Sequence, residues 1–242
     1  MEKKYILTEE AKEVGGHILH RIQAMRDFGG VQKGDLGGWV ESEENLSHDG
    51  DCWIFDNGRV SGNGKVSGNG KVSGNGEVYG NGRVYDNGWV FDNGRVFGNG
   101  RVFGDGRVFG DGEVYDNGWV SDNGKVSDDG WVYDNGWVSG NGEVYGNGRV
   151  SDDGWVFGNA KIGFNAYISS PRSYFVQGPI GSRNDFLTCY LDKDKKIYAV
   201  TGCFCGSIEV FVKKVKAVHG MNRWAKQYLK AAEMARVMLS GD

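Results

Sequence analysis

The chain has 242 residues, of which 42 are glycine and 2 are proline, and its formal net charge at pH 7 is −4. That charge gives no general electrostatic reason to bind double-stranded nucleic acid or an anionic membrane, so we expect neither as a partner. The sequence has no apolar run of membrane-spanning length, no apolar signal-peptide core and no framework spacing among its four cysteines. We therefore expect a protein of the reducing cytoplasm.

Residues 1–53 are predicted to form an N-terminal hairpin and cap. Two segments suited to strands, 4–8 and 17–25, flank Val14-Gly15-Gly16, a sequence typical of a tight turn. The stretches 34–40 and 46–54 then lead into the repeats that follow. A cap is expected here because an open solenoid exposes strand edges at its ends.

Residues 54–170 are predicted to form a parallel β-helix. From Ile54 to Ile168, Val or Ile occupies every sixth position, and an Asn/Asp–Gly or Asn–Ala pair precedes each one after the first, which makes twenty hexads. A disordered tract has no need of a periodic apolar residue, and a meander of such short arms would bury almost nothing. The pairs therefore indicate corners, because Asn, Asp and Gly tolerate positive φ. Three hexads close one triangular coil with the aliphatic side chains inside, and the coils stack by parallel pairing.

This hexad resembles the repeat of the left-handed β-helix family, and the resemblance implies left-handed winding. Both ends of the chain resemble uncharacterised phage and prophage proteins with hexapeptide repeats, especially at 34–40, 178–183 and 201–206. The N-terminal region also resembles an enterobacterial protein. A phage origin implies that the protein acts in the cytoplasm of a host cell.

Many family members are acyltransferases that use a histidine base beside a loop interrupting the hexads. No loop interrupts the hexads of this chain, and its four histidines all lie outside them: His17, His20, His48 and His219. From this departure we predict that the chain is not an enzyme and has no catalytic residue, cofactor or metal. Transferase activity stays open as an alternative.

Residues 171–242 are predicted to form a small α+β domain. Alternating patterns predict strands at 185–191 and 196–204, and Ser207 and Asn222 are suitable N-caps for two helices ending near Gly220 and Leu239. The buried face of the first helix is predicted to comprise Ile208, Phe211, Val212, Val215 and Val218. Cys189, Cys203, Cys205 and His219 could supply a zinc site, but the usual C-x₂-C pair is absent, which favours core thiols.

Outward positions of the β-helix supply the candidate binding residues. Side chains 18 residues apart should stack, and one such column is Lys65, Arg83, Arg101, Trp119, Trp137 and Trp155, with Tyr85, Phe103 and Phe157 beside it. Contiguous aromatic surface usually marks an interface, so we predict a homo-oligomer, either a dimer or a trimer. The polar residues Ser182 and Arg183 form a second, weaker candidate in the C-terminal domain.

These observations lead to three hypotheses about function. The first is a non-catalytic phage-type binding or scaffold protein that oligomerises and engages a host component, such as part of a defence system. The second is a sponge that sequesters a small anionic nucleotide signal with basic and stacked aromatic side chains. The third is a hexapeptide-repeat acyl- or nucleotidyl-transferase.

Overall fold

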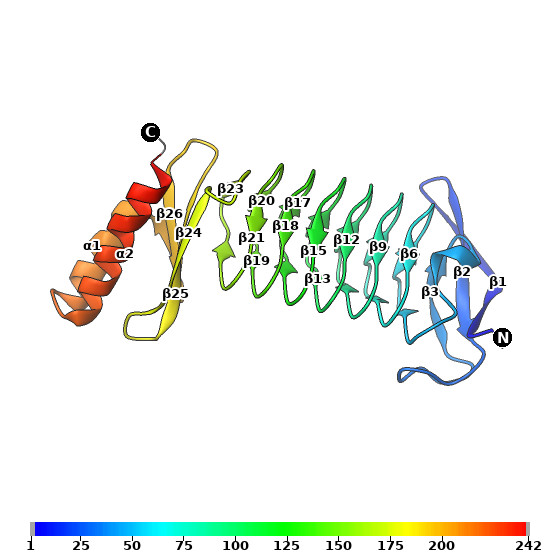
Figure 1. Ribbon diagram of the computed structural model, residues 1–242. Helices are drawn as coiled ribbons and strands as arrows, with labels where there is room; N and C mark the ends of the chain where they lie inside the picture. Colours follow the sequence, from blue (N-terminus) through cyan, green and yellow to red (C-terminus); the bar gives the residue numbers. More distant parts are fainter. Residues whose placement is uncertain (1–2, 241–242) are drawn as a thin grey trace.

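The computed structural model describes residues 3–240 and shows an elongated molecule with three parts in chain order (Figure 1). An N-terminal hairpin covers one end of a central solenoid, and a small antiparallel sheet with two helices covers the other. The mainly β fold predicted from the hexads is therefore confirmed, including the hairpin and the C-terminal α+β part.

The N-terminal part consists of β1 (Tyr5–Val14), β2 (His17–Ala24), β3 (Leu36–Val40) and the short 3-10 helix η1 (Glu43–Asn45). Strands β1 and β2 pair in antiparallel fashion around Gly15 and Gly16, whose φ angles of 58° and 83° glycine adopts without strain. Strand β3 pairs antiparallel with β2 and parallel with the solenoid strand β5. The hairpin thus continues one sheet of the solenoid and pairs what would otherwise be an open edge.

The solenoid contains twenty two-residue strands in three parallel sheets. The β5–β23 sheet comprises β5 (Arg59–Val60), β8 (Glu77–Val78), β11 (Arg95–Val96), β14 (Glu113–Val114), β17 (Trp131–Val132), β20 (Arg149–Val150) and β23 (Tyr167–Ile168). The β4–β22 sheet comprises β4 (Trp53–Ile54), β7 (Lys71–Val72), β10 (Trp89–Val90), β13 (Arg107–Val108), β16 (Lys125–Val126), β19 (Glu143–Val144) and β22 (Lys161–Ile162). The β6–β21 sheet comprises β6 (Lys65–Val66), β9 (Arg83–Val84), β12 (Arg101–Val102), β15 (Trp119–Val120), β18 (Trp137–Val138) and β21 (Trp155–Val156).

Each corner uses two positions of the hexad, one that adopts positive φ and one that must be small. Positive φ falls on the residue before the Asn/Asp, as in Gly68 (62°) and Asp86 (53°), rather than on the Asn–Gly pair as expected from the sequence. The glycine after the Asn/Asp is needed for close packing instead, because a Cβ on Gly64 would lie 2.8 Å from the carbonyl oxygen of Val78 in the next coil. Ala160 and Ala166 replace this glycine in the last coil, beyond which no further solenoid strand stacks.

The core is a column of aliphatic side chains enclosed by the three sheets. Every Val or Ile of the hexads from Ile54 to Ile168 is at most 1% exposed, including Val102 and Val108. Outside, the asparagines of successive coils form hydrogen-bonded ladders, as where Asn63 Nδ2 donates to Asn81 Oδ1 at 3.2 Å. Burial therefore explains why the inward position of each hexad is aliphatic, and hydrogen bonds between successive coils stabilise the corners.

The C-terminal part packs two helices on an antiparallel sheet of β24 (Tyr174–Ile180), β25 (Asp185–Leu191), β26 (Ile197–Thr201) and β27 (Phe204–Ser207). Helix α1 (Ile208–His219) begins after Ser207, whose Oγ accepts the Val210 N–H, and α2 (Arg223–Leu239) begins after Asn222 as predicted. None of the helices within residues 3–240 is long and apolar enough to cross a membrane.

The C-terminal part differs from the prediction in three details. The expected strand 196–204 is two strands, because Gly202 (φ 53°) turns the chain between β26 and β27, and β24 was not assigned in advance. Val218, predicted to lie on the buried face of α1, is instead 66% exposed and lines a cavity.

Candidate functional site

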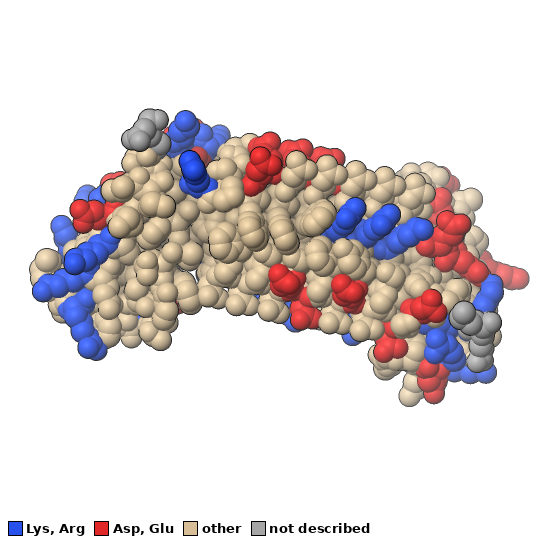
Figure 2. Space-filling model, in the orientation of Figure 1, with Lys and Arg blue, Asp and Glu red and all other residues tan. Residues whose placement is uncertain are grey.

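The β6–β21 sheet brings together the six side chains of the predicted column, and the predicted site residue Phe103 follows β12 and lies against the ring of Trp119. On consecutive strands Lys65 lies beside Arg83, Arg83 beside Arg101, and Arg101 beside Trp119. The column continues through Trp137 and Trp155. Figure 2 shows the basic side chains as a row over β6, β9 and β12, and an uncharged surface over β15 to β21. The predicted change from cationic to aromatic along this edge is therefore present.

The three cations of this column lack ion-pair partners among residues 3–240. On the neighbouring sheets three cations form ion pairs with acidic residues in register: Arg59 with Glu77, Arg95 with Glu113, and Lys125 with Glu143. Two cations, Arg107 and Lys125, also lie side by side on the β4–β22 sheet, but three in a row occur on the β6–β21 sheet. Like charges placed directly opposite on paired strands destabilise a sheet. The column of Lys65, Arg83 and Arg101 is thus a concentration of positive charge that the fold does not neutralise with an ion pair.

An open cavity of about 410 Å³ lies over these cations. Its lining comprises Lys65, Ser67, Gly68, Arg83, Tyr85, Asp86 and Arg101. Asp86 is the single acidic residue of that lining. Tyr85 stacks face to face on Phe103, with ring centroids 5.0 Å apart and planes inclined by 2°. The Tyr85 hydroxyl can donate a hydrogen bond, and burial raises its pKa further above neutral pH.

The aromatic stack ends at Tyr85 because the equivalent residue of the preceding coil is the small Ser67. One face of the Tyr85 ring therefore has no aromatic neighbour and borders the cavity. At the same hexad position, an indole from the following coil covers Ser73, Ser121 and Ser139. Ser67 instead has Arg83 sixteen residues later, just as Ser61 and Ser127 have a glutamate there, so Ser67 is not covered by an indole of this kind.

The tryptophans farther along the column have a structural role that the sequence analysis missed. The indole N–H of Trp137 donates to Ser121 Oγ at 2.8 Å, and that of Trp155 donates to Ser139 Oγ at 2.9 Å. The rings of Trp137 and Trp155 also stack, with centroids 5.1 Å apart. A serine sixteen residues before a tryptophan is the sequence signal for this contact, and it recurs where Trp89 Nε1 donates to Ser73 Oγ at 2.9 Å.

Because the indoles bond to serines and stack on one another, less aromatic surface is exposed to solvent than the sequence suggests. Trp119 and Trp137 are half-buried, whereas Trp155 and Phe157 are 38% and 43% exposed. The Arg101 guanidinium lies 5.1 Å from the ring of Trp119, so the cationic and aromatic halves of the column are in contact. Part of the aromatic column is therefore a stabilising ladder, and its exposed surface is concentrated at Trp155 and Phe157.

The other two predicted site residues lie far from this sheet. Ser182 and Arg183 occupy the turn between β24 and β25, where they line a second cavity with residues of α1. The prediction of core thiols holds for Cys189, which is buried, but is wrong for Cys203, which is exposed in the turn after β26 and lines the same cavity. A turn residue has no sheet neighbour above it, which explains its exposure.

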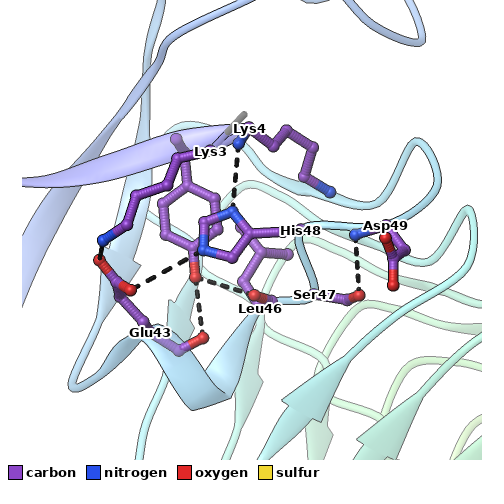
Figure 3. A network of polar contacts seen from close by, with 8 residues as sticks. Lys3, Lys4, Glu43, Leu46, Ser47, His48 and Asp49 are labelled. Carbon is purple, nitrogen blue, oxygen red and sulfur yellow. Dashed lines mark hydrogen bonds and ion pairs between the residues drawn. The ribbon is translucent and has the colours of Figure 1, made fainter. Parts of the chain in front are cut away.

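Two histidines of the N-terminal part contact carboxylates. His48 stacks on Tyr5 with ring centroids 4.4 Å apart, and its Nδ1 accepts the backbone N–H of Lys4 at 3.2 Å (Figure 3). Its Nε2 then carries the proton and points to Glu43 Oε2 at 3.9 Å. His17 Nδ1 lies 2.9 Å from Glu41 Oε2, and this hydrogen bond holds the pKa of Glu41 below its usual range. The exposed His17–Glu41 pair is thus the better placed of the two for proton transfer.

Comparison with known proteins gives one partial similarity. No family model matches the chain. The chain is 33% identical over 67 residues to the protein named "Uncharacterized acetyltransferase YdcK" of Escherichia coli (strain K12). This alignment covers 24% of the chain and 21% of that protein, so the chain spans about a fifth of the relative's length. The similarity agrees with the expected resemblance to hexapeptide-repeat proteins.

The prediction that the chain is not an enzyme needs correction in the light of this similarity. A relative carries the name of an acetyltransferase, and the solenoid has the fold of hexapeptide-repeat transferases. The prediction relied on the lack of a histidine inside the hexads. Histidines outside the hexads, such as His17 beside Glu41, can still supply a base, so that departure from the family pattern does not exclude transfer chemistry.

Proposed function

We propose that this chain is a binding scaffold that captures a phosphate-bearing ligand with an aromatic ring, such as a nucleotide, on the β6–β21 sheet. The observation that carries the proposal is the run of three cations on adjacent strands, Lys65, Arg83 and Arg101, without an ion-pair partner among the described residues. A ligand with several negative charges would neutralise this run. Phosphate groups suit it because Arg and Lys bind them by charge-assisted hydrogen bonds.

The aromatic part of the ligand would occupy the space over Ser67. There a flat ring would continue the stack of Phe103 and Tyr85, in the way that the indoles of Trp137 and Trp155 cover their own serines. Stacking of a base on an aromatic side chain contributes about 1–3 kcal/mol. The resemblance of both chain ends to phage proteins supports a nucleotide signal of the host cell as the ligand, with the protein acting as a sponge or as a scaffold for a host component.

Self-association is the second part of this proposal. Trp155 and Phe157 are exposed on the same sheet, and burying them against a second copy would remove apolar surface from water. Trp119 and Trp137 would border that contact, and the cationic half of the column would remain open at the N-terminal end. A dimer or a trimer assembled in this way would present several copies of the cationic site.

Titration calorimetry with ATP, AMP and inorganic triphosphate tests the ligand. We expect ATP to bind more tightly than either probe, because ATP alone supplies both the ring and the full set of negative charges. Arg83→Gln should weaken ATP binding by roughly 10- to 100-fold through loss of a charge-assisted hydrogen bond. Tyr85→Ala should weaken ATP but leave triphosphate unchanged. Arg95→Gln, on the neighbouring sheet, is the matched control and should bind like the parent.

Equal binding of ATP by the Arg83 and Arg95 variants would contradict the proposal, as would the failure of the parent to bind any of the three probes. Equal affinity of the parent for ATP and triphosphate would refute the role of Tyr85. Native mass spectrometry of the purified protein adds an independent measurement, since it reports the number of subunits and the mass of any retained ligand.

Acetyl transfer is a second candidate function, favoured by the name of the YdcK relative and by the His17–Glu41 pair at 2.9 Å. Histidine beside a carboxylate is the usual arrangement of a general base. The test is an acetyl-donor turnover assay with a panel of amine and hydroxyl acceptors. A rate that falls in His17→Gln, and not in His48→Gln or His219→Gln, would support it, and unchanged turnover in all three variants would refute it.

A further inference from the structure

A second cavity, of about 240 Å³, opens where two turns of the C-terminal sheet meet helix α1. The β24–β25 turn brings Ser182 and Arg183 to it, and the β26–β27 turn brings Gly202 and Cys203. These turns are about twenty residues apart in the sequence, and the pairing of β25 with β26 places them at the same end of the sheet. The cavity therefore depends on the packed domain and belongs to a different part of the molecule from the solenoid site.

The floor of the cavity is apolar. It is formed by Phe204, Phe211 and Val215, and the Phe204 and Phe211 rings have centroids 5.4 Å apart. Phe211 also packs edge-on against Tyr228, with centroids 5.7 Å apart and planes inclined by 89°. Phe211 and Val215 belong to the core of this domain, so the floor is held rigidly by packing on its far side. Such a surface suits the apolar body of a small ligand.

The rim of the cavity is cationic. Arg183 comes from the sheet turn, and Lys214 comes from α1. Neither Arg183 nor Lys214 forms an ion pair within residues 3–240. The one acidic residue of the lining, Asp185, accepts the backbone N–H groups of Phe186 at 2.8 Å and of Gly202 at 3.2 Å. The rim thus offers cations to a ligand, while its carboxylate already accepts hydrogen bonds from the protein.

A tyrosine of α2 lines the same cavity, and its hydroxyl lies beside the β24–β25 turn. The Tyr228 side chain as a whole is 6% exposed, while its hydroxyl oxygen is still accessible to solvent. Gly181 permits this position, because a Cβ there would lie 1.9 Å from the Tyr228 hydroxyl oxygen. The Gly181 N–H also donates to Gln227 Oε1 at 2.9 Å, which fixes the turn against α2. A hydroxyl of this kind can donate a hydrogen bond to a ligand in the cavity.

We propose that this cavity binds a small molecule with an apolar body and a single carboxylate, independently of the ligand proposed for the solenoid. The apolar body lies on Phe204, Phe211 and Val215. The carboxylate lies at the rim, where Arg183 and Lys214 supply charge and the Tyr228 hydroxyl donates a hydrogen bond. A guanidinium on a fixed turn suits a planar carboxylate because its N–H groups form a matching fork.

Titration calorimetry of the full chain with octanoate and with octanol tests the charge requirement. We expect octanoate to bind at least tenfold more tightly than octanol. Arg183→Gln and Lys214→Gln should each weaken octanoate by roughly 10-fold or more, and Tyr228→Phe by about 2- to 10-fold, from the usual strengths of charged and neutral hydrogen bonds. Lys213→Gln, one residue away on an exposed position, is the control and should bind like the parent.

Alkylation of the exposed Cys203 by iodoacetamide gives a second readout that needs no variant. Saturating octanoate should slow this reaction several-fold, and octanol at the same concentration should not. Absence of octanoate binding, equal binding of octanoate and octanol, or an equal loss in Lys213→Gln would each overturn the proposal. The variants of the solenoid site, Arg83→Gln and Tyr85→Ala, should bind octanoate normally, so the two proposals can fail separately.

Discussion

Replacing Arg83 by Gln should make the free protein more stable, which is the opposite of the usual effect of removing an arginine from an ordered sheet. Arg83 stands between Lys65 and Arg101 on adjacent strands, so its removal abolishes two like-charge neighbours. A cross-strand charge pair is worth about 0.2–1 kcal/mol, so the expected gain is about 0.4–2 kcal/mol. At about 2–4 °C per kcal/mol for a chain of this size, the thermal midpoint should rise by a few degrees.

Arg95→Gln provides the matched comparison on the β5–β23 sheet. Arg95 lies between Glu77 and Glu113 and pairs with Glu113, so this variant should lose about 0.2–1 kcal/mol. Thermal unfolding should be followed by circular dichroism in about 0.02 M and about 1 M salt. Both differences should shrink at high salt, where the screening length of about 3 Å is below the strand spacing of about 4.8 Å. Destabilisation by Arg83→Gln at low salt would refute the reasoning about the unneutralised column.

Three further predictions concern the core, the assembly and the response to pH. Val102→Asp should cost several kcal/mol by placing a charge without a partner in the core, and an unfolding midpoint equal to that of the parent would show that the register is wrong. Substituting Ser at Trp119, Trp137 and Trp155 together should lower the mass measured by light scattering, while Trp131→Ser on another sheet should not; a monomeric parent would exclude this interface. Burial raises the pKa of Tyr115 to about 12, so stability should be complete below pH 10 and decline as pH rises from about 10 to 12. An absorbance titration of the folded protein that places all its tyrosines near pH 10 would contradict that shift.

The arrangement of the candidate solenoid site was predictable because the repeat converts sequence distance into spatial distance. Lys65 and Arg83 are 18 residues apart, and one coil of three hexads places them side by side. The direction of each side chain was not predictable in the same way. Trp137 turns toward Ser121 because the small serine leaves room for the indole and its hydroxyl accepts the N–H, which depends on two specific neighbours in different coils.

The sequence by itself determined the β-helix, since an aliphatic residue at every sixth position can be buried throughout only if three short sides close around it. It also determined the starts of both helices, because Ser207 and Asn222 satisfy backbone N–H groups locally. Only the tertiary structure decided which surfaces stay open. The face of Tyr85 is open because Ser67 precedes it in the stack, and the C-terminal cavity exists because strand pairing brings two turns against α1. Both depend on contacts between segments distant in the chain, which local propensity does not encode.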